Sequence, residues 1–352
     1  MQMNLVLKLV IPLVFFGYAA AANLSLVRAD GGEVPLTQSV MTGELSKELD
    51  RLYRENLPHK EPSIGLLGAL RYVVLGEGRK GVIVGDDGYL FTIEEFRDVD
   101  EAVYAHGLDM VGEAQTALAA RGVDLVVVPL PAKIDLLRDR APDASYGVTL
   151  EKLYQRFVHD LEDNGISVVD SRPALASTDA PFIATDTHWT PEGALNVAKA
   201  IANSGAIVTG EDGFVTEEDP TVSLVGDLVT YVTSDNYAEL IGLDPVDITP
   251  YRAIPAVEET GTLDIFGGTG GAVDLVGTSY SANPNWSFAE SLKLSLGRDV
   301  INYAEEGQGP FEPMQGYLAS LDPLALPEAV IWEIPIRYLT DPALLDPSLE
   351  GS

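Results

Sequence analysis

Apolar and polar positions along this chain fall into alternating blocks that predict strands and helices in turn. Continuous apolar runs, such as VDLVVVPL (123–130) and AVIWEIPI (329–336), predict short strands that are buried on both faces. The segments between them place apolar residues three to four positions apart, as amphipathic helices do. The predicted order is helix (97–121), strand (123–133), helix (149–164), strand (165–173), helix (190–202), strand (272–281), helix (285–297), strand (298–309), helix (311–321) and strand (328–339).

Strands of this kind that alternate with helices indicate a parallel sheet covered on both faces. The sequence therefore predicts an α/β fold with a doubly wound, flavodoxin-like parallel sheet. We expect the strands that end near Val128, Val276, Tyr303 and Glu333 to lie side by side. Residues 205–270 break the rhythm because they are rich in Asp, Glu, Thr and Gly, and we interpret them as an insertion.

The main domain is expected to span residues 81–345. At its start, KGVIVGDDGYLFT (80–92) predicts two short strands around an Asp-Gly turn. Residues 29–80 are interpreted as a helical lead-in, because TGELSKELDRLYRENL (42–57) has the apolar spacing of a helix.

The first 28 residues are a candidate export signal. Lys8 precedes an uncharged, mostly apolar run over residues 9–27. This run fits a cleaved signal peptide, with residues 19–22 as the cleavage zone, and it also fits an uncleaved anchor in the inner membrane. The preceding positive charge favours a cytoplasmic N-terminus, so we expect the rest of the chain to lie in the periplasm.

Composition narrows the classes of function. The chain has 54 acidic and 22 basic residues, a formal net charge of −32, which argues against nucleic acid as a partner. It has no cysteine, which excludes thiol catalysis, disulfides and zinc–cysteine sites. It also has no Walker loop, dinucleotide fingerprint, HExxH or EF-hand spacing. We therefore expect neither a cofactor nor a metal.

The segment ATDTHWTPEGA (184–194) places an acid and a histidine at the start of a helix. Thr190 is a candidate N-cap and Pro191 suits the first helical position. In an extended loop, side chains two positions apart point the same way, so Asp186 can accept a hydrogen bond from one ring nitrogen of His188. The other nitrogen is then a candidate general base. The alternative is a surface Asp–His pair beside a buried Trp189.

Ser279 is the candidate nucleophile, since it follows an apolar strand and a glycine in VDLVGTSYS (273–281). In a parallel sheet, functional residues gather at the carboxyl ends of the strands, where nearby amide N–H groups can stabilise an oxyanion. An ordinary turn serine is the alternative, and Ser281 is the nearest rival as nucleophile.

Other residues are candidates for oxyanion or substrate contacts. Gly307 and Gly309 follow the next strand, where glycine allows close backbone approach, although a helix-entry turn explains them almost as well. Tyr280 adjoins the serine. Arg337 and Lys133 can hold an anionic group or merely cap the sheet edge. The remaining histidines are interpreted as surface or helix residues: His59, His106 and His159.

These motifs resemble the AlgX/AlgJ alginate O-acetyltransferase family, which is SGNH hydrolase-like. The resemblance rests on VIVGDDGYLF, VVVPLPAKID, ATDTHWTPEGA, LVGTSYS, EEGQGPFEPMQGYL and VIWEIPIRYL, in that order along roughly residues 60–340. Ordinary SGNH enzymes carry the serine motif first and Asp-x-x-His last. Here the order is reversed and the spacing is Asp-x-His, as in the permuted arrangement of this family. The sequence ends soon after the last motif, without an additional carbohydrate-binding module, and so is more similar to the AlgJ branch.

The resemblance implies a periplasmic O-acetyltransferase of exopolysaccharide biosynthesis. By resemblance, Ser279 is the nucleophile that carries the acetyl group, His188 the base and Asp186 its orienting acid. The implied partners are a membrane protein that delivers the acetyl donor and a polysaccharide or acetyl-accepting protein. Two alternatives stay open: a secreted SGNH-type carbohydrate acetylesterase, and a non-catalytic component of a polysaccharide secretion complex.

Overall fold

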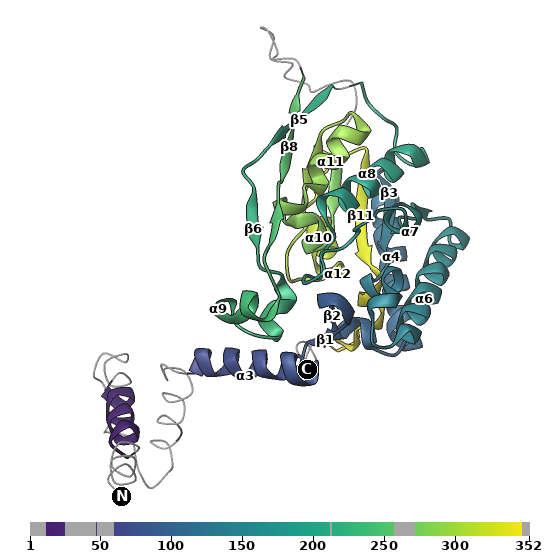
Figure 1. The fold of residues 1–352 in the computed structure, drawn as a ribbon. Coiled ribbons are helices and arrows are strands. Elements are labelled where there is room, and N and C mark those ends of the chain that lie inside the picture. Colours follow the sequence, from purple (N-terminus) through teal and green to yellow (C-terminus); the bar gives the residue numbers. More distant parts are fainter. Residues whose placement is uncertain (1–11, 25–46, 48–59, 212, 257–271, 347–352) are drawn as a thin grey trace, which may run out of the picture.

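The computed structural model describes residues 12–24, 47, 60–211, 213–256 and 272–346. At its centre lies a five-stranded sheet in the order β10-β9-β11-β3-β4, in which every neighbouring pair is parallel (Figure 1). This confirms the predicted parallel sheet and the side-by-side placement of four of its strands. The strands are β3 (Asp124–Leu130), β4 (Ser167–Val168), β9 (Val273–Val276), β10 (Val300–Asn302) and β11 (Ala329–Pro335).

The strand order confirms the permuted arrangement. When β9 is counted as the first strand and the chain is followed through β10 and β11 to β3 and β4, the order across the sheet is 2-1-3-4-5. That is the flavodoxin-like order. The polypeptide thus enters this fold at its fourth strand, which explains why the Asp-x-His motif precedes the serine motif in the sequence.

Helices cover both faces of the sheet (Figure 1). In β3, Leu125 and Val127 belong to one hydrophobic core and Val126 and Val128 to the other, as expected for a strand that is buried on both sides. The first core is completed by α4 (Glu101–Ala119), α6 (Ala144–Asp163) and α12 (Phe311–Ser320); the second by α7 (Arg172–Ala176), α8 (Pro191–Ser204) and α11 (Phe288–Leu296).

Element boundaries differ from the predicted ones where local capping decides. Helix α6 starts earlier than predicted because the Asp143 side chain accepts the Ser145 N–H. The strands β3 and β9 stop short of the predicted ends. Beyond them the chain turns into two short helices that carry site residues, α5 (Lys133–Leu136) and α10 (Ser279–Ala282).

The described residues of the segment interpreted as an insertion contribute no strand to the central sheet. It forms two antiparallel pairs, β5 (Phe214–Glu218) with β8 (Tyr251–Pro255) and β6 (Val222–Leu224) with β7 (Val246–Ile248). Between them lie η5 (Asp227–Tyr231), α9 (Asp235–Ala238) and η6 (Glu239–Ile241). The predicted hairpin at the start of the domain is confirmed as β1 (Val82–Val84) paired with β2 (Leu90–Thr92). The remaining short elements are η2 (Asp86–Gly88), η3 (Ile93–Phe96), η4 (Arg138–Arg140), η7 (Pro284–Trp286), η8 (Ile336–Thr340) and η9 (Pro342–Leu344).

Helical residues also precede this domain. Residues 12–24 are helical, and α3 (Lys60–Leu75) lies against the insertion (Figure 1). Among the described residues, no helix is both long and apolar enough to cross a membrane. Both ends of the apolar run over 9–27 lie outside the described residues, as does the predicted helix over 42–57 apart from Lys47.

Candidate active site

Two loops from distant parts of the chain meet at the carboxyl edge of the sheet. The first precedes α8, which begins as predicted: Thr190 caps it by accepting the Gly193 N–H at 3.1 Å, and Pro191 occupies the first position. The second follows β9, where Thr278 caps the short helix α10 and Ser279 is its first residue. The sheet therefore brings together residues that lie 91 positions apart.

The side chains of these loops form one hydrogen-bonded chain. The Ser279 Oγ lies 2.7 Å from His188 Nε2, and His188 Nδ1 lies 2.6 Å from Asp186 Oδ1. The predicted contacts are thus confirmed. Asp186 is buried and the His188 side chain is 13% exposed. Since a carboxylate accepts the Nδ1 hydrogen, Nε2 is left as the acceptor for the serine hydroxyl.

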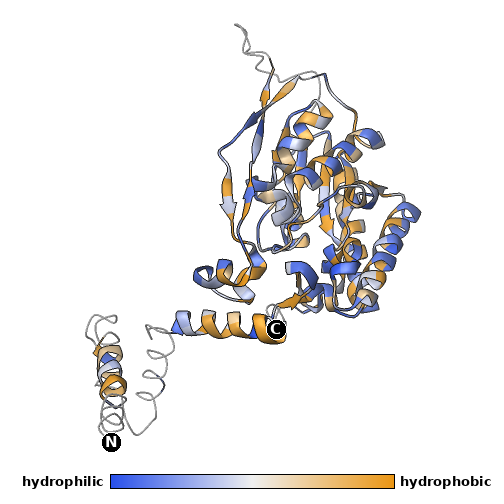
Figure 2. Ribbon diagram, in the orientation of Figure 1, coloured by the Kyte–Doolittle hydropathy of each residue, from blue (hydrophilic) through white to orange (hydrophobic). Residues whose placement is uncertain are grey.

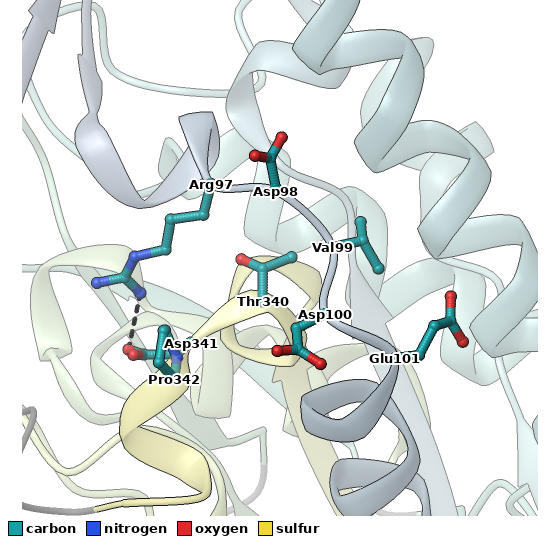
Figure 3. Close-up of a pocket in the computed structure, with 8 residues that line it drawn as sticks. All are labelled: Arg97, Asp98, Val99, Asp100, Glu101, Thr340, Asp341 and Pro342. Atoms are coloured by element: carbon teal, nitrogen blue, oxygen red, sulfur yellow. Dashed lines mark ion pairs between the residues drawn. The ribbon is translucent and has the colours of Figure 1, made fainter.

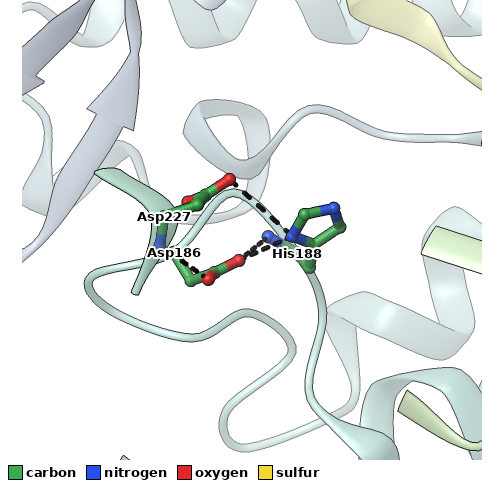
Figure 4. Close-up of side chains that lie close together, drawn as sticks. All are labelled: Asp186, His188 and Asp227. Carbon is green, nitrogen blue, oxygen red and sulfur yellow. Dashed lines mark hydrogen bonds and ion pairs between the residues drawn. The ribbon is translucent and has the colours of Figure 1, made fainter. Parts of the chain in front are cut away.

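A second carboxylate, Asp227, joins the pair from the insertion (Figure 4). Its backbone N–H donates to Asp186 Oδ2 at 2.9 Å, and its Oδ1 accepts the Thr187 N–H at 2.8 Å. Its Oδ2 lies 3.8 Å from His188 Nδ1. Asp227 was not predicted from the sequence. The preceding Gly226 lets the segment approach the Asp-x-His loop closely, since a Cβ there would collide with the Thr185 carbonyl.

The two carboxyls respond to this crowding in opposite ways. Burial works to raise the pKa of Asp186, but the hydrogen bond and charge of His188 outweigh it and the pKa is lowered. Burial, together with the neighbouring Asp186 charge, raises the pKa of Asp227. Among the described residues, these two acids and His188 are the one group spaced so that it could hold a metal ion. The direct 2.6 Å contact between Nδ1 and Asp186 leads us to interpret it as a hydrogen-bonded group.

Lys133 is buried beneath the Asp-x-His loop and does not face an open site. Its ammonium lies 2.7–2.9 Å from four backbone carbonyls, those of Leu90, Ile183, Ala184 and Asp186. From the sequence, Lys133 could either hold an anion or cap the sheet edge. In the structure its ammonium instead ties the Asp-x-His loop to β2. Burial lowers its pKa to about 8, against the opposing effect of Glu95, Asp186 and Asp227.

Tyr280 and Arg337 also support the site from within. Both are buried. Arg337 Nη1 donates to the Tyr280 hydroxyl at 2.9 Å, and that hydroxyl donates to the Thr187 carbonyl at 2.7 Å. Arg337 Nε pairs with Glu94 at 2.9 Å. These bonds to protein groups support a positioning role, and contact of Tyr280 and Arg337 with substrate stays a prediction.

Ser281 is also committed elsewhere. It is buried and its hydroxyl donates to Glu333 Oε2 at 3.0 Å, an oxygen that also accepts the Thr278 N–H at 2.8 Å. Burial raises the pKa of Glu333. The rival serine therefore anchors the nucleophile loop to β11. His188 itself stacks on Trp286 with ring centroids 5.2 Å apart, which fixes the imidazole plane.

Gly307 and Gly309 have φ values of +76° and +63°, so their turn requires glycine. Gly309 lies near the ring of Tyr338, and the assignment of both glycines to the oxyanion stays a prediction.

His106 and His159 are exposed as expected, whereas His59 lies outside the described residues. An open hollow of ≈630 Å³ is lined by residues 97–101 and 340–342 (Figure 3). Asp186, His188 and Ser279 are not among its lining residues.

Comparison with known proteins now identifies the family. The family model described as "SGNH hydrolase-like domain, acetyltransferase AlgX" matches residues 82–336. The chain belongs to this family. The expected resemblance and the α/β fold class are thereby confirmed, because the matched range contains every strand of the sheet and all three residues of the hydrogen-bonded chain.

Individual relatives point to one branch. The "Probable alginate O-acetylase AlgJ" of Azotobacter vinelandii is 35% identical over 96% of this chain and 90% of that protein. That of Pseudomonas fluorescens is 36% identical over 92% and 82%, respectively. Proteins named "Alginate biosynthesis protein AlgX" match at 27–30% identity. The expected closeness to the AlgJ branch is confirmed.

Solved structures agree. The "O-Acetyltransferase Domain of Pseudomonas putida AlgJ" has a TM-score of 0.64 and 32% identity, with 76% of this chain and 96% of that chain covered. The structure of Pseudomonas aeruginosa AlgX has a TM-score of 0.58 and 23% identity over 77% and 68%. At that identity the second match speaks for the fold alone.

Proposed function

We propose that this protein transfers acetyl groups to hydroxyls of an alginate-type exopolysaccharide through an acetyl-Ser279 intermediate. Membership of the acetyltransferase family and the names of the AlgJ relatives support the reaction and the polymer. The unbroken contact from Ser279 through His188 to Asp186 carries the proposal, because a hydroxyl needs an oriented base to become a nucleophile.

The first half-reaction loads the serine. Ser279 Oγ attacks the carbonyl carbon of an acetyl donor while His188 Nε2 takes the hydroxyl proton. The tetrahedral oxyanion accepts the Ser279 N–H, which, as the first amide of α10, has no acceptor within the helix. When the intermediate collapses, the bond to the leaving group breaks and His188 returns the proton to it.

The second half-reaction releases the acetyl group. A sugar hydroxyl gives its proton to His188, its oxygen bonds to the acetyl carbon, and the Ser279 ester bond breaks with return of the proton to Oγ. Each oxyanion donor is typically worth about 3–4 kcal/mol. Asp186, and Asp227 beside it, stabilise the imidazolium that forms in both halves.

The proposed location is the periplasm, with residues 9–27 as signal or anchor. Polymer acetylation outside the cytoplasm requires an activated acetyl group to cross the membrane. A membrane protein that delivers the donor, and a polysaccharide or carrier protein that accepts the acetyl group, are therefore the proposed partners.

The test is incubation with para-nitrophenyl acetate and mannuronate oligosaccharides, followed by mass spectrometry of protein and sugar. We expect an acetyl adduct on Ser279 and acetylated oligosaccharide. Ser279→Ala should abolish both, whereas Ser281→Ala is the matched control that retains both. Release of free acetate with no acetylated sugar would instead indicate an esterase, and an adduct on another residue would refute the assignment of the nucleophile.

A further inference from the structure

Helix α3 turns its large apolar side chains away from the protein. Leu66, Leu67, Leu70, Val73 and Val74 recur at the spacing of one helix face and are 57–65% exposed. Figure 2 shows α3 as a mostly hydrophobic helix at the edge of the molecule. A helix that faced only water would carry polar residues there, so this outer face of α3 indicates a binding surface.

The inner face of α3 is held firmly by the insertion. Gly65 and Gly68 lie so close to the segment 232–234 that a Cβ at either position would collide with it. The Thr233 hydroxyl, buried in this contact, donates to the Gly65 carbonyl at 2.8 Å. Small residues thus permit close packing on one side, while the leucines and valines are presented on the other by a fixed support.

The surroundings of the outer face match a membrane interface. Residues 62–70 carry no charge, and residues 62–80 include three basic residues and one acidic residue. The net charge of the whole chain, by contrast, is −32. Arg79 and Lys80 are exposed just beyond the helix, next to the half-exposed Tyr231, whose ring lies against Gly81. Apolar residues bordered by Arg, Lys and Tyr are typical of protein surfaces that bind lipid headgroups.

We propose that the outer face of α3 lies on the surface of a phospholipid bilayer with anionic headgroups. The same chain carries the apolar run over 9–27, within which the side chains of Leu13, Val14, Phe15 and Phe16 are 65–71% exposed. The proposal rests on the anchor role that the proposed function gives as one of two for residues 9–27, and it adds a second contact. An anchor and an interfacial helix on one chain reinforce each other through effective concentration, and they fix the orientation of the domain.

The chain has no cysteine, so single cysteines introduced by mutation can be labelled without background. Full-length Leu67→Cys and Val74→Cys carry a fluorophore on the outer face of α3. Leu13→Cys reports on the N-terminal run, and Leu324→Cys, which replaces a 94% exposed leucine of the domain, is the matched control. Each variant is reconstituted in vesicles of phosphatidylethanolamine and phosphatidylglycerol, with or without spin-labelled lipid.

We expect spin-labelled lipid to quench the labels at 13, 67 and 74 and to leave the label at 324 unaffected. Replacing the anionic lipid by phosphatidylcholine should reduce quenching at 67 and 74. All four variants should retain ester turnover, which shows that they are folded. Quenching at 13 without quenching at 67 and 74 would overturn the proposal while leaving the anchor and the acetyltransferase intact. Labels at 67 and 74 that are shielded equally without lipid would indicate a protein contact and also overturn it.

Discussion

Replacing Asp227 by asparagine removes one negative charge beside His188 while the loop keeps its hydrogen bonds. The amide oxygen of the new side chain still accepts the Thr187 N–H, and the backbone N–H of residue 227 still donates to Asp186. The substitution therefore tests the charge of the second carboxylate and leaves its scaffolding role in place. We expect slower acetyl transfer, because the imidazolium that forms on His188 loses a neighbouring anion.

The size of the effect follows from the 3.8 Å between Asp227 Oδ2 and His188 Nδ1. Coulomb's law gives about 1 kcal/mol at the dielectric constant of water and about 4 kcal/mol at an effective value near 20. The Asp227 side chain is 43% exposed, so solvent screening favours the lower figure. About 1 kcal/mol corresponds to about a fivefold fall in rate.

The rate is measured as kcat/KM for para-nitrophenyl acetate, and the formation of acetyl-Ser279 is followed by mass spectrometry. Both should fall in Asp227→Asn, because the imidazolium forms as the serine attacks the acetyl donor.

An unchanged kcat/KM in Asp227→Asn would refute the electrostatic reasoning. Asp186→Asn is the reference, since Asp186 touches the ring at 2.6 Å, and it should lower the rate more strongly. Equal effects of the two substitutions would contradict the view that Asp186 is the principal partner. Thermal unfolding of both variants shows whether the loop itself has been disturbed.

Three further predictions concern the residues that support the site. Lys133→Met leaves four carbonyls without their buried ammonium and should lower the free energy of unfolding in urea by about 3–5 kcal/mol. In the wild type, ester turnover should fall as the pH rises through about 8, because Lys133 loses its proton there. Ser281→Ala removes one hydrogen bond to Glu333 and should cost about 1–3 kcal/mol in urea unfolding with no loss of the acetyl adduct by mass spectrometry. Tyr280→Phe leaves the Thr187 carbonyl unpaired and should lower kcat more than KM in steady-state assays, because the ring of His188 is then less well held.

The sheet was predictable because β3, β9 and β11 are apolar on both faces, a pattern that only a doubly covered strand requires. Their order was predictable through the motifs, since the family resemblance implied a permuted chain. Helix α8 was predictable from Thr190 and Pro191. The fold of the insertion was not predictable, because its strands are short and mostly exposed. Neither the period of a strand nor that of a helix therefore dominates its apolar pattern.

Within the site, the residues whose role is carried by a local motif were found. Asp186 and His188 lie two positions apart, and Ser279 follows a strand and a glycine. Asp227 was missed because it lies 41 positions from Asp186, in a segment with many other acids. Tyr280 and Arg337 were found as site residues, but the sequence does not show that their polar atoms face Thr187 and Glu94.

The buried ionisable groups around the site act on backbone atoms. Lys133 holds the carbonyls of the loop before α8, and the Glu95 carboxylate in turn accepts the N–H groups of Lys133 and Ile134 at 2.9–3.0 Å. Glu333 holds the Thr278 N–H in the other loop. Burying such charges is costly unless hydrogen bonds compensate. Bonds of Lys133 and Glu333 restrain the two loops, and those of Glu95 hold the start of α5, which carries Lys133.

These buried charges explain how two loops from opposite halves of a permuted chain maintain the 2.7 Å contact between Ser279 Oγ and His188 Nε2. The serine follows β9 and the histidine lies in the loop before α8, so the two share no local sequence and neither can orient the other before the sheet has formed. If each loop is held separately by its own buried charge, Lys133 or Glu333, then the sheet and these charges determine where the two loops meet. Combining Lys133→Met with Ser281→Ala should then give nearly additive losses of stability, because the two anchors share no partner, while the acetylation rate should fall more than the single effects predict.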